Sequence, residues 1–161
     1  MDISVIRKRF LLAGYEVAMD FNKGFKAEMQ WVRGELERSI DRIGGKTEPM
    51  RLVGFWQPYR AFLETPDETG AAKAKYFFGI EISGLESIPS DCVVRVIAES
   101  AYAVYREASR GSAPKAEMYA QPGYVYNPEI AGDFEIFDGF DSLGEGDPCD
   151  VLVPLRFLEA K

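Results

Sequence analysis

The chain has 161 residues, with 19 Lys and Arg against 26 Asp and Glu, and a net charge of −7. Because 47% of the residues are hydrophobic and 28% are charged, the composition predicts one folded globular domain and excludes a disordered chain. The acidic balance repels a phosphate backbone, and no basic run extends beyond Arg7-Lys8-Arg9. We therefore expect no direct binding to nucleic acid.

Histidine is absent from the sequence. The chain thus lacks the usual general base, the usual metal ligand and the axial ligand of most haem sites. We expect no metal and no cofactor, and any acid/base chemistry falls to carboxylates and tyrosines. The two cysteines, Cys92 and Cys149, lack the spacing of a metal or redox motif. We expect them to be reduced thiols, with a disulfide between them as the alternative.

The N-terminal segment carries a basic cluster followed by Phe10-Leu11-Leu12-Ala13. Glu16 and Asp20 interrupt this apolar run well before it reaches the length of a signal-peptide core or a membrane span. We therefore expect a cytoplasmic protein with no membrane partner.

One long amphipathic helix is predicted over residues 25–43. Its apolar face recurs at steps of three or four and consists of Phe25, Met29, Val32, Leu36, Ile40 and Ile43. Charged residues cover the opposite face, as expected of a solvated helix surface. Gly44-Gly45 ends the helix. A second, short helix is expected over residues 113–120.

Short runs rich in Val, Ile, Tyr and Phe, bounded by Gly, Pro, Asp and Ser, predict β-strands. These runs cover residues 5–12, 14–19, 51–57, 75–82, 92–98, 102–106, 134–137 and 150–157. The residues Thr-Pro-Asp-Glu-Thr-Gly at 65–70 predict a turn-rich loop between two of the strands.

Two halves of one domain, about 1–88 and 89–161, follow the same expected order of strand, helix, strand, strand. Gly14-Tyr15-Glu16-Val17 before the long helix matches Ala101-Tyr102-Ala103-Val104 before the short one. The expected fold is α+β: duplicated units form a curved antiparallel sheet with both helices on one face. We expect the opposite face to be concave and open, with a ligand cleft between the halves.

Common catalytic and phosphate-binding motifs are missing from the sequence. Gly79-Ile80-Glu81-Ile82-Ser83-Gly84 lacks the glycine spacing and the following helix of a phosphate loop. The unusual feature is the density of aromatic residues in the later strands and loops, where the alternative to a binding role is core and hairpin packing.

Glu135 is the main candidate for a functional carboxylate. In Phe134-Glu135-Ile136-Phe137, strand alternation places Phe134 and Ile136 on one face and Glu135 with Phe137 on the other. If Phe134 and Ile136 pack under a helix, Glu135 points into the opposite face among aromatic rings. A desolvated carboxylate there attracts a cation. The alternative is a strand glutamate that faces water.

Five segments, in this order, resemble the GyrI-like effector-binding family: Arg51-Leu52-Val53-Gly54-Phe55, Lys75-Tyr76-Phe77-Phe78-Gly79-Ile80, Tyr102-Ala103-Val104-Tyr105, Asp133-Phe134-Glu135-Ile136-Phe137 and Asp150-Val151-Leu152-Val153-Pro154-Leu155. The resemblance covers nearly the whole chain. The family includes ligand-binding halves of AraC-type and MerR-type regulators, the bacterial gyrase inhibitor, stand-alone binding domains and some cyclopropanoid hydrolases. It is related in fold to the SOUL haem-binding proteins.

The resemblance implies a role for Glu135 at the centre of a ligand pocket and an aromatic position at Tyr76, with Trp31 and Trp56 as looser matches. Where the family often has Trp-x-Pro, this chain has Tyr124-Val125-Tyr126-Asn127-Pro128. The expected ligand-binding residues are Glu135, Tyr76, Tyr124, Tyr126, Trp56, Trp31 and Phe137. The implied function is multidrug-like small-molecule binding by a stand-alone protein, with Glu135 favouring aromatic or lipophilic cations.

Two other functions remain open under the same resemblance. In the first, the chain is a hydrolase of cyclopropanoid or similar electrophiles, with Glu135 as the candidate catalytic base and Tyr124 or Tyr126 as hydrogen-bond donor. In the second, which ranks below it, the chain is a gyrase-inhibitor-like interaction protein. The expected binding domain uses all 161 residues, so we expect no helix-turn-helix segment. Haem binding is disfavoured because there is no histidine.

Overall fold

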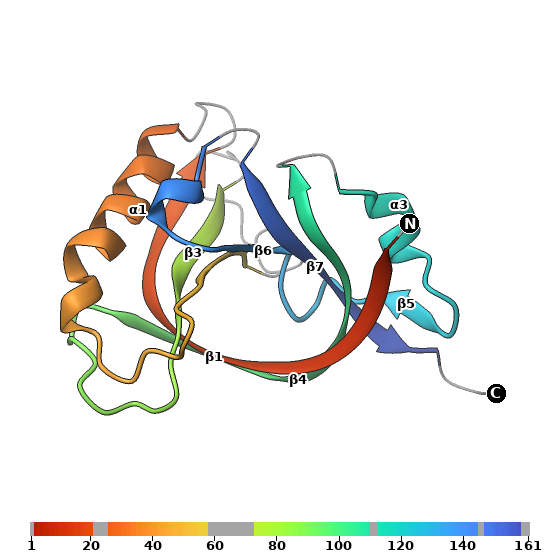
Figure 1. Cartoon of the computed structure of the whole chain (residues 1–161), viewed down its shortest axis with the longest axis horizontal. Helices are drawn as coiled ribbons and strands as arrows, with labels where there is room; N and C mark the ends of the chain where they lie inside the picture. Colours follow the sequence, from red (N-terminus) through yellow and green to blue (C-terminus); the bar gives the residue numbers. More distant parts are fainter. Residues whose placement is uncertain (1, 21–25, 58–72, 110–112, 145–146, 159–161) are drawn as a thin grey trace.

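The computed structural model describes residues 2–20, 26–57, 73–109, 113–144 and 147–158. Within these ranges the strands are β1 (Ile3–Asp20), β2 (Leu52–Trp56), β3 (Lys73–Glu81), β4 (Val93–Ser109), β5 (Tyr124–Tyr126), β6 (Phe134–Phe137) and β7 (Pro148–Phe157). The α-helices are α1 (Lys26–Ser39) and α3 (Lys115–Tyr119). Two short 3-10 helices, η1 (Ile40–Arg42) and η2 (Phe140–Ser142), complete the set. Figure 1 shows β1 and β4 as long, strongly curved strands.

The strands form a single antiparallel sheet in the order β4-β1-β3-β2-β6-β7-β5. Because β4 also pairs with β7, the first six strands of this order close into a ring, and β5 extends from β7. The predicted α+β fold with a curved antiparallel sheet is confirmed.

The pairing repeats between the two parts of the chain. In the first part β3 lies between β1 and β2, and in the second β7 lies between β4 and β6. The two parts meet along two seams, β1 with β4 and β2 with β6. This repeated topology supports the division into halves at about residue 88, which we retain as a proposal.

The short motif that suggested the repeat does not mark equivalent positions. Tyr15 packs in the core beneath the helices, whereas Tyr102 packs inside the closed sheet. The two tyrosines thus face opposite sides, and the correspondence expected between them is wrong.

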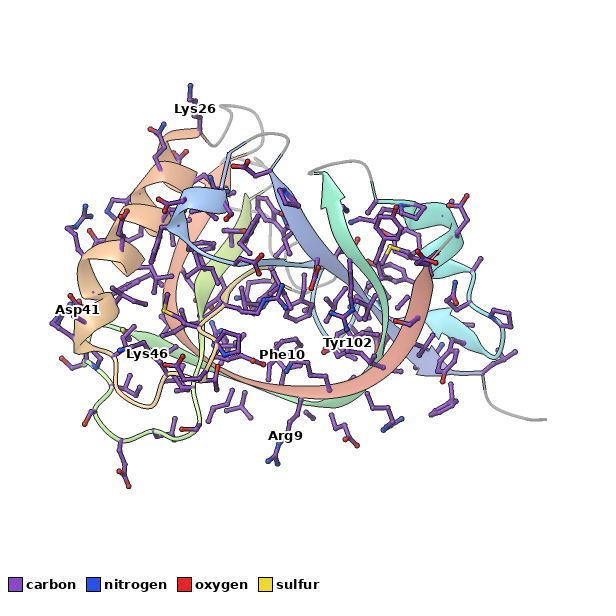
Figure 2. All side chains as sticks on the ribbon, viewed as in Figure 1. Arg9, Phe10, Lys26, Asp41, Lys46 and Tyr102 are labelled. Atoms are coloured by element: carbon purple, nitrogen blue, oxygen red, sulfur yellow. The ribbon has the colours of Figure 1, made fainter. Side chains whose placement is uncertain are left out.

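An aromatic core fills the inside of the closed sheet. Phe10 stacks on Phe134 with ring centroids 4.8 Å apart, and Tyr102 meets Phe134 edge to face at 5.6 Å. Figure 2 shows Phe10 and Tyr102 inside the curve of β1, while Arg9 points away from it. The expectation of an open, concave face opposite the helices is therefore wrong, because closure of the sheet lets these rings fill that side.

Both helices pack on the outside of the closed sheet, as predicted. Val32 and Leu36 of α1 and Met118 of α3 are fully buried in one apolar cluster with residues of β1, β3, β4 and β7. The predicted long helix corresponds to α1 and η1, although Phe25 lies outside the described residues.

The elements differ from prediction in three places. Residues 5–12 and 14–19 form one strand, β1, and residues 92–98 and 102–106 belong to another, β4. The strand β5 was not predicted, and the loop expected at 65–70 lies outside the described residues. Gly14 does not break β1: a Cβ atom there would lie 2.2 Å from the carbonyl oxygen of Phe78, so this glycine allows two strands to approach closely.

A buried carboxylate lies at one end of the interior core. Asp150, only 6% exposed, accepts hydrogen bonds from Arg51 Nη2 at 2.9 Å and Arg106 Nη1 at 3.3 Å. Arg51 also forms an ion pair with the exposed Asp138. Because side chains alternate along a strand, the neighbours of Asp150, Cys149 and Val151, point to the helix-bearing face.

Candidate functional site

Glu135 lies on β6 at the seam where the two halves meet. It pairs with Gly54 of β2 on one side and with Val151 of β7 on the other. Phe134 and Ile136 point into the interior core, so Glu135 and Phe137 share the helix-bearing face. In Figure 1, β6 crosses the middle of the molecule, with α1 on the left and α3 on the right. Phe134 and Ile136 therefore do not pack under a helix, which was one possibility considered from the sequence. The prediction that Glu135 and Phe137 share a face is confirmed.

Aromatic rings of the first half lie beside Glu135. The phenol of Tyr76 covers Gly54, the direct partner of Glu135, at a distance that leaves no room for a Cβ atom. Trp56 meets the Tyr76 ring edge to face, with centroids 5.1 Å apart. Tyr76 and Phe137 are each 1% exposed and belong to one buried cluster on the face that Glu135 shares, whereas Trp56 and Glu135 are half-buried.

The second half contributes a thiol to Glu135. Cys149 of β7 donates to Glu135 Oε2 across 3.9 Å, and its own side chain is buried. Both cysteines are free thiols. We call Glu135, Gly54, Tyr76, Phe137 and Cys149 the Glu135 cluster.

A second polar group, the Asp133 cluster, adjoins the first. Asp133 precedes Glu135 by two residues and accepts hydrogen bonds from Lys115 Nζ at 2.5 Å and Tyr119 Oη at 2.7 Å. Tyr126 Oη donates to its other oxygen across 3.4 Å, and the rings of Tyr119 and Tyr126 lie 4.4 Å apart. The Asp133 cluster thus joins α3 and β5 to the start of β6.

The tyrosines of the Asp133 cluster are neutral donors over the physiological pH range. Burial, and then the negative charge of Asp133, raises the pKa of Tyr126 to about 12. Burial and the hydrogen bond to Asp133 raise the pKa of Tyr119 even further above its usual range. Phenols in this state donate hydrogen bonds and present ring faces to a ligand.

The remaining predicted residues lie farther along the elements. Tyr124, at the other end of β5, stacks on Phe157 with centroids 4.9 Å apart. Trp31 is 48% exposed and lies on the solvent side of α1. Of the seven residues predicted for the site, Tyr76, Phe137 and Trp56 belong to one apolar cluster on the face that Glu135 shares. Tyr126 contacts Asp133, two residues before Glu135.

Sequence reasoning did not identify Gly54, Cys149, Asp133 or Tyr119 as site residues. The spacing of Asp133, two positions before Glu135 in the same run, was a usable signal because strand residues two apart share a face. The positions of Gly54 and Cys149 beside Glu135 depend on long-range strand pairing, which the sequence does not specify.

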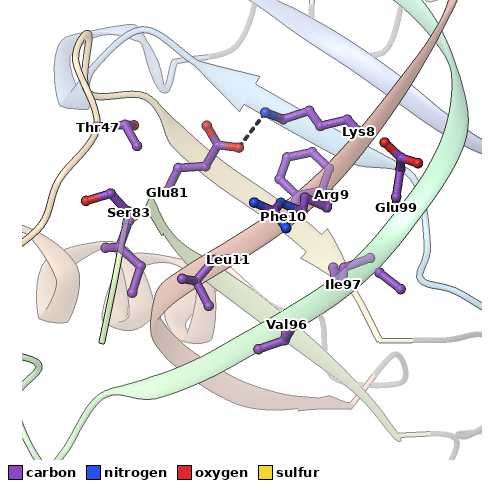
Figure 3. A pocket seen from close by; sticks show the side chains of 12 residues that line it. Lys8, Arg9, Phe10, Leu11, Thr47, Glu81, Ser83, Val96, Ile97 and Glu99 are labelled. Atoms are coloured by element: carbon purple, nitrogen blue, oxygen red, sulfur yellow. Dashed lines mark ion pairs between the residues drawn. The ribbon is translucent and has the colours of Figure 1, made fainter. Parts of the chain in front are cut away.

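A separate cavity of about 800 Å³ lies near the bend of β1 (Figure 3). Lys8 and Glu81 form an ion pair of 2.6 Å on its wall, together with Phe10, Ile97 and Thr47. None of the residues predicted for ligand binding lines this cavity.

Within the described ranges, no group of three or more Cys, Asp or Glu side chains is arranged to hold a metal ion. The helices in those ranges include none with the length and apolar character needed to cross a membrane.

No protein-family model matches the sequence, and no curated protein matches it. Solved structures are similar in fold. SAV2435 bound to tetraphenylphosphonium has a TM-score of 0.58 and 16% sequence identity, over 97% of this chain and 94% of that one. The EcmrR C-terminal domain has a TM-score of 0.61 and 9% identity, over 98% of both chains. A proposed bacterial transcription regulator from Staphylococcus aureus MU50 has a TM-score of 0.55 and 15% identity, over 97% and 99%. These similarities show that the chain shares its fold with these proteins over nearly its whole length.

Proposed function

We propose that the chain is a GyrI-like small-molecule-binding domain that takes aromatic or lipophilic cations on its helix-bearing face, with Glu135 as the counter-charge. The observation that carries this proposal is the position of Glu135. Its half-buried carboxylate lies where β2 of one half pairs with β6 of the other, beside the Tyr76 phenol. A partly desolvated carboxylate among rings attracts a cation more strongly than one in water.

The aromatic surroundings suit a flat or globular lipophilic cation. Rings contribute cation–π attraction of roughly 0.5–2 kcal/mol each, which is sensitive to charge and tolerant of shape. Trp56, which packs on Tyr76, and Tyr126, which contacts Asp133, are half-buried, so each exposes part of a ring. These properties favour broad specificity for ligands that carry both rings and a positive charge.

The comparison with SAV2435 supports the same ligand class. That protein, which has the same fold, has been solved with tetraphenylphosphonium, a lipophilic aromatic cation. Because the two sequences are only 16% identical, the proposed ligand class rests mainly on the residues of this chain. Tetraphenylphosphonium is the natural first probe.

Isothermal titration of the purified chain with tetraphenylphosphonium and with neutral triphenylphosphine oxide tests the proposal. We expect reversible binding of the cation at micromolar concentrations and weaker binding of the neutral compound. Backbone amide shifts mapped by NMR should centre on β2, β6 and β7. Absence of cation binding, or shifts confined to the cavity beside Lys8 and Glu81, would overturn the proposal.

The hydrolase alternative is distinguished in a parallel incubation. A cyclopropane-bearing electrophile is mixed with the protein and its products are followed by mass spectrometry. Turnover beyond one equivalent that is lost in Glu135→Gln would replace the binding function by a catalytic one.

A further inference from the structure

The thiol of Cys149 on β7 lies beside Glu135, with its Sγ 3.9 Å from Glu135 Oε2. This distance is within the range of a hydrogen bond that involves sulfur, and the thiol is the donor because an ionised carboxylate only accepts. Cys149 is 3% exposed, and its side chain belongs to the buried cluster on the helix-bearing face.

The backbone of β7 holds the thiol in this place from both sides. Cys149 pairs with Ala108 of β4, and the next residue, Asp150, pairs with Ile136 of β6. Asp150 points into the interior, where Arg51 and Arg106 donate to it. Since side chains alternate along a strand, anchoring Asp150 inside keeps Cys149 on the outside, facing Glu135.

A thiol has a particular effect on a carboxylate. It is a weak, uncharged donor, so it restrains the rotation of the Glu135 side chain without cancelling its charge. An oriented carboxylate needs less reorganisation when a cation arrives, and preorganisation of this kind raises affinity.

We propose that Cys149 is a positioning residue that sets the affinity of the Glu135 cluster for cations. This inference rests on the proposed function and adds a specificity-determining residue to it. It concerns the preference for charge, so the affinity for a neutral aromatic ligand does not depend on the thiol donor.

The test compares substitutions that remove the donor with one that keeps it. Cys149→Ala and Cys149→Val remove the donor, and the valine variant retains most of the volume if the alanine variant is unstable. Cys149→Ser keeps a donor of similar size. Cys92→Ala, at the other cysteine of the chain, is the matched control. A thermal unfolding curve of each variant identifies those that are folded at the titration temperature.

Titration with tetraphenylphosphonium and triphenylphosphine oxide gives the readout. We expect Cys149→Ala and Cys149→Val to lose on the order of threefold to tenfold in affinity for the cation, with the neutral compound unchanged. Cys149→Ser should stay within about twofold of the unmodified chain, because the hydroxyl restores the donor, and Cys92→Ala should match it for both probes.

Equal losses for both probes in Cys149→Ala and Cys149→Val would show that the thiol contributes only packing, and would overturn the inference. Unchanged cation affinity in these variants would also overturn it, while leaving the proposed function intact. If the unmodified chain binds neither probe, the proposed function fails first, and the positioning role falls with it.

Discussion

The phenol of Tyr76 lies over the backbone of Gly54, so that a Cβ atom added to Gly54 would lie 2.0 Å from Tyr76 Oη. Gly54 is also the strand partner of Glu135. The absence of a side chain at this one position therefore lets an aromatic ring of the first half pack over the strand partner of Glu135. The Glu135 cluster depends on this contact.

Gly54→Ala should displace the Tyr76 ring and weaken the fold. Because Tyr76 is 1% exposed, its ring has little space in which to move, and overpacking of this kind costs about 1–3 kcal/mol. Cation affinity should fall together with the free energy of unfolding, which urea titration measures. Gly139→Ala is the control, since a Cβ atom there would have no neighbour within 4 Å. An equal loss of stability in Gly54→Ala and Gly139→Ala would contradict the contact between Tyr76 and Gly54.

Leu36→Ala should cost about 2–5 kcal/mol of stability, as truncation of a buried leucine does. Leu36 is fully buried between α1 and the sheet, in the same cluster as Tyr76 and Phe78. Chemical denaturation of this variant and of Glu37→Ala, on the exposed side of α1, measures the difference. An unchanged midpoint for Leu36→Ala would show that α1 does not pack through this face.

Alkaline pH should destabilise the fold through the tyrosines of the Asp133 cluster. Burial and Asp133 raise the pKa of Tyr126 to about 12, above the unfolded value of about 10. The folded state therefore holds this proton more tightly. Its contribution to stability is complete below about pH 10 and is lost as the pH rises towards 12.

Urea midpoints measured from pH 8 to pH 12, with Tyr126→Phe beside the unmodified chain, test this dependence. The phenylalanine variant should lose less stability across the upper part of the range. Parallel curves for the two proteins would mean that Tyr126 ionises as it does in the unfolded chain.

Asp150→Asn should destabilise the interior by about 1–3 kcal/mol, because it removes the charged acceptor shared by Arg51 and Arg106. Asp138→Asn is the matched control: Asp138 also contacts Arg51, but its side chain is 78% exposed, so its loss should change stability by about 0.5 kcal/mol or less. Thermal unfolding of both variants separates these expectations. A loss of the same size at Asp138 would indicate that surface charge, rather than the buried acceptor, matters.

Local sequence patterns predicted the strands best where each strand is short and bounded by turns. The strand from Phe134 to Phe137 has its predicted limits, and the alternation within it correctly paired Glu135 with Phe137. The helix period of Val32 and Leu36 likewise identified the buried face of α1. These features depend on residues close together in the chain, which is why the sequence reveals them.

Closure of the sheet could not be read from the same patterns. The pairing of β4 with β7 joins residues 39 to 54 positions apart, and nothing local distinguishes an open curved sheet from a closed one. For the same reason the sequence left open which face Glu135 takes. The partners Gly54 and Cys149 come from two distant strands, so their contact with Glu135 emerges only from the register.

Glu135→Gln tests the central claim most directly, because the amide keeps the size and hydrogen-bonding capacity of the side chain and removes its charge. Fluorescence or calorimetric titration with tetraphenylphosphonium should show a loss of affinity of about tenfold or more, equivalent to about 1.4 kcal/mol, with triphenylphosphine oxide nearly unchanged. Stability should barely change, since no charge remains to be held partly away from water. Equal losses for the cation and the neutral compound, or no loss for either, would contradict the role of Glu135 as the counter-charge.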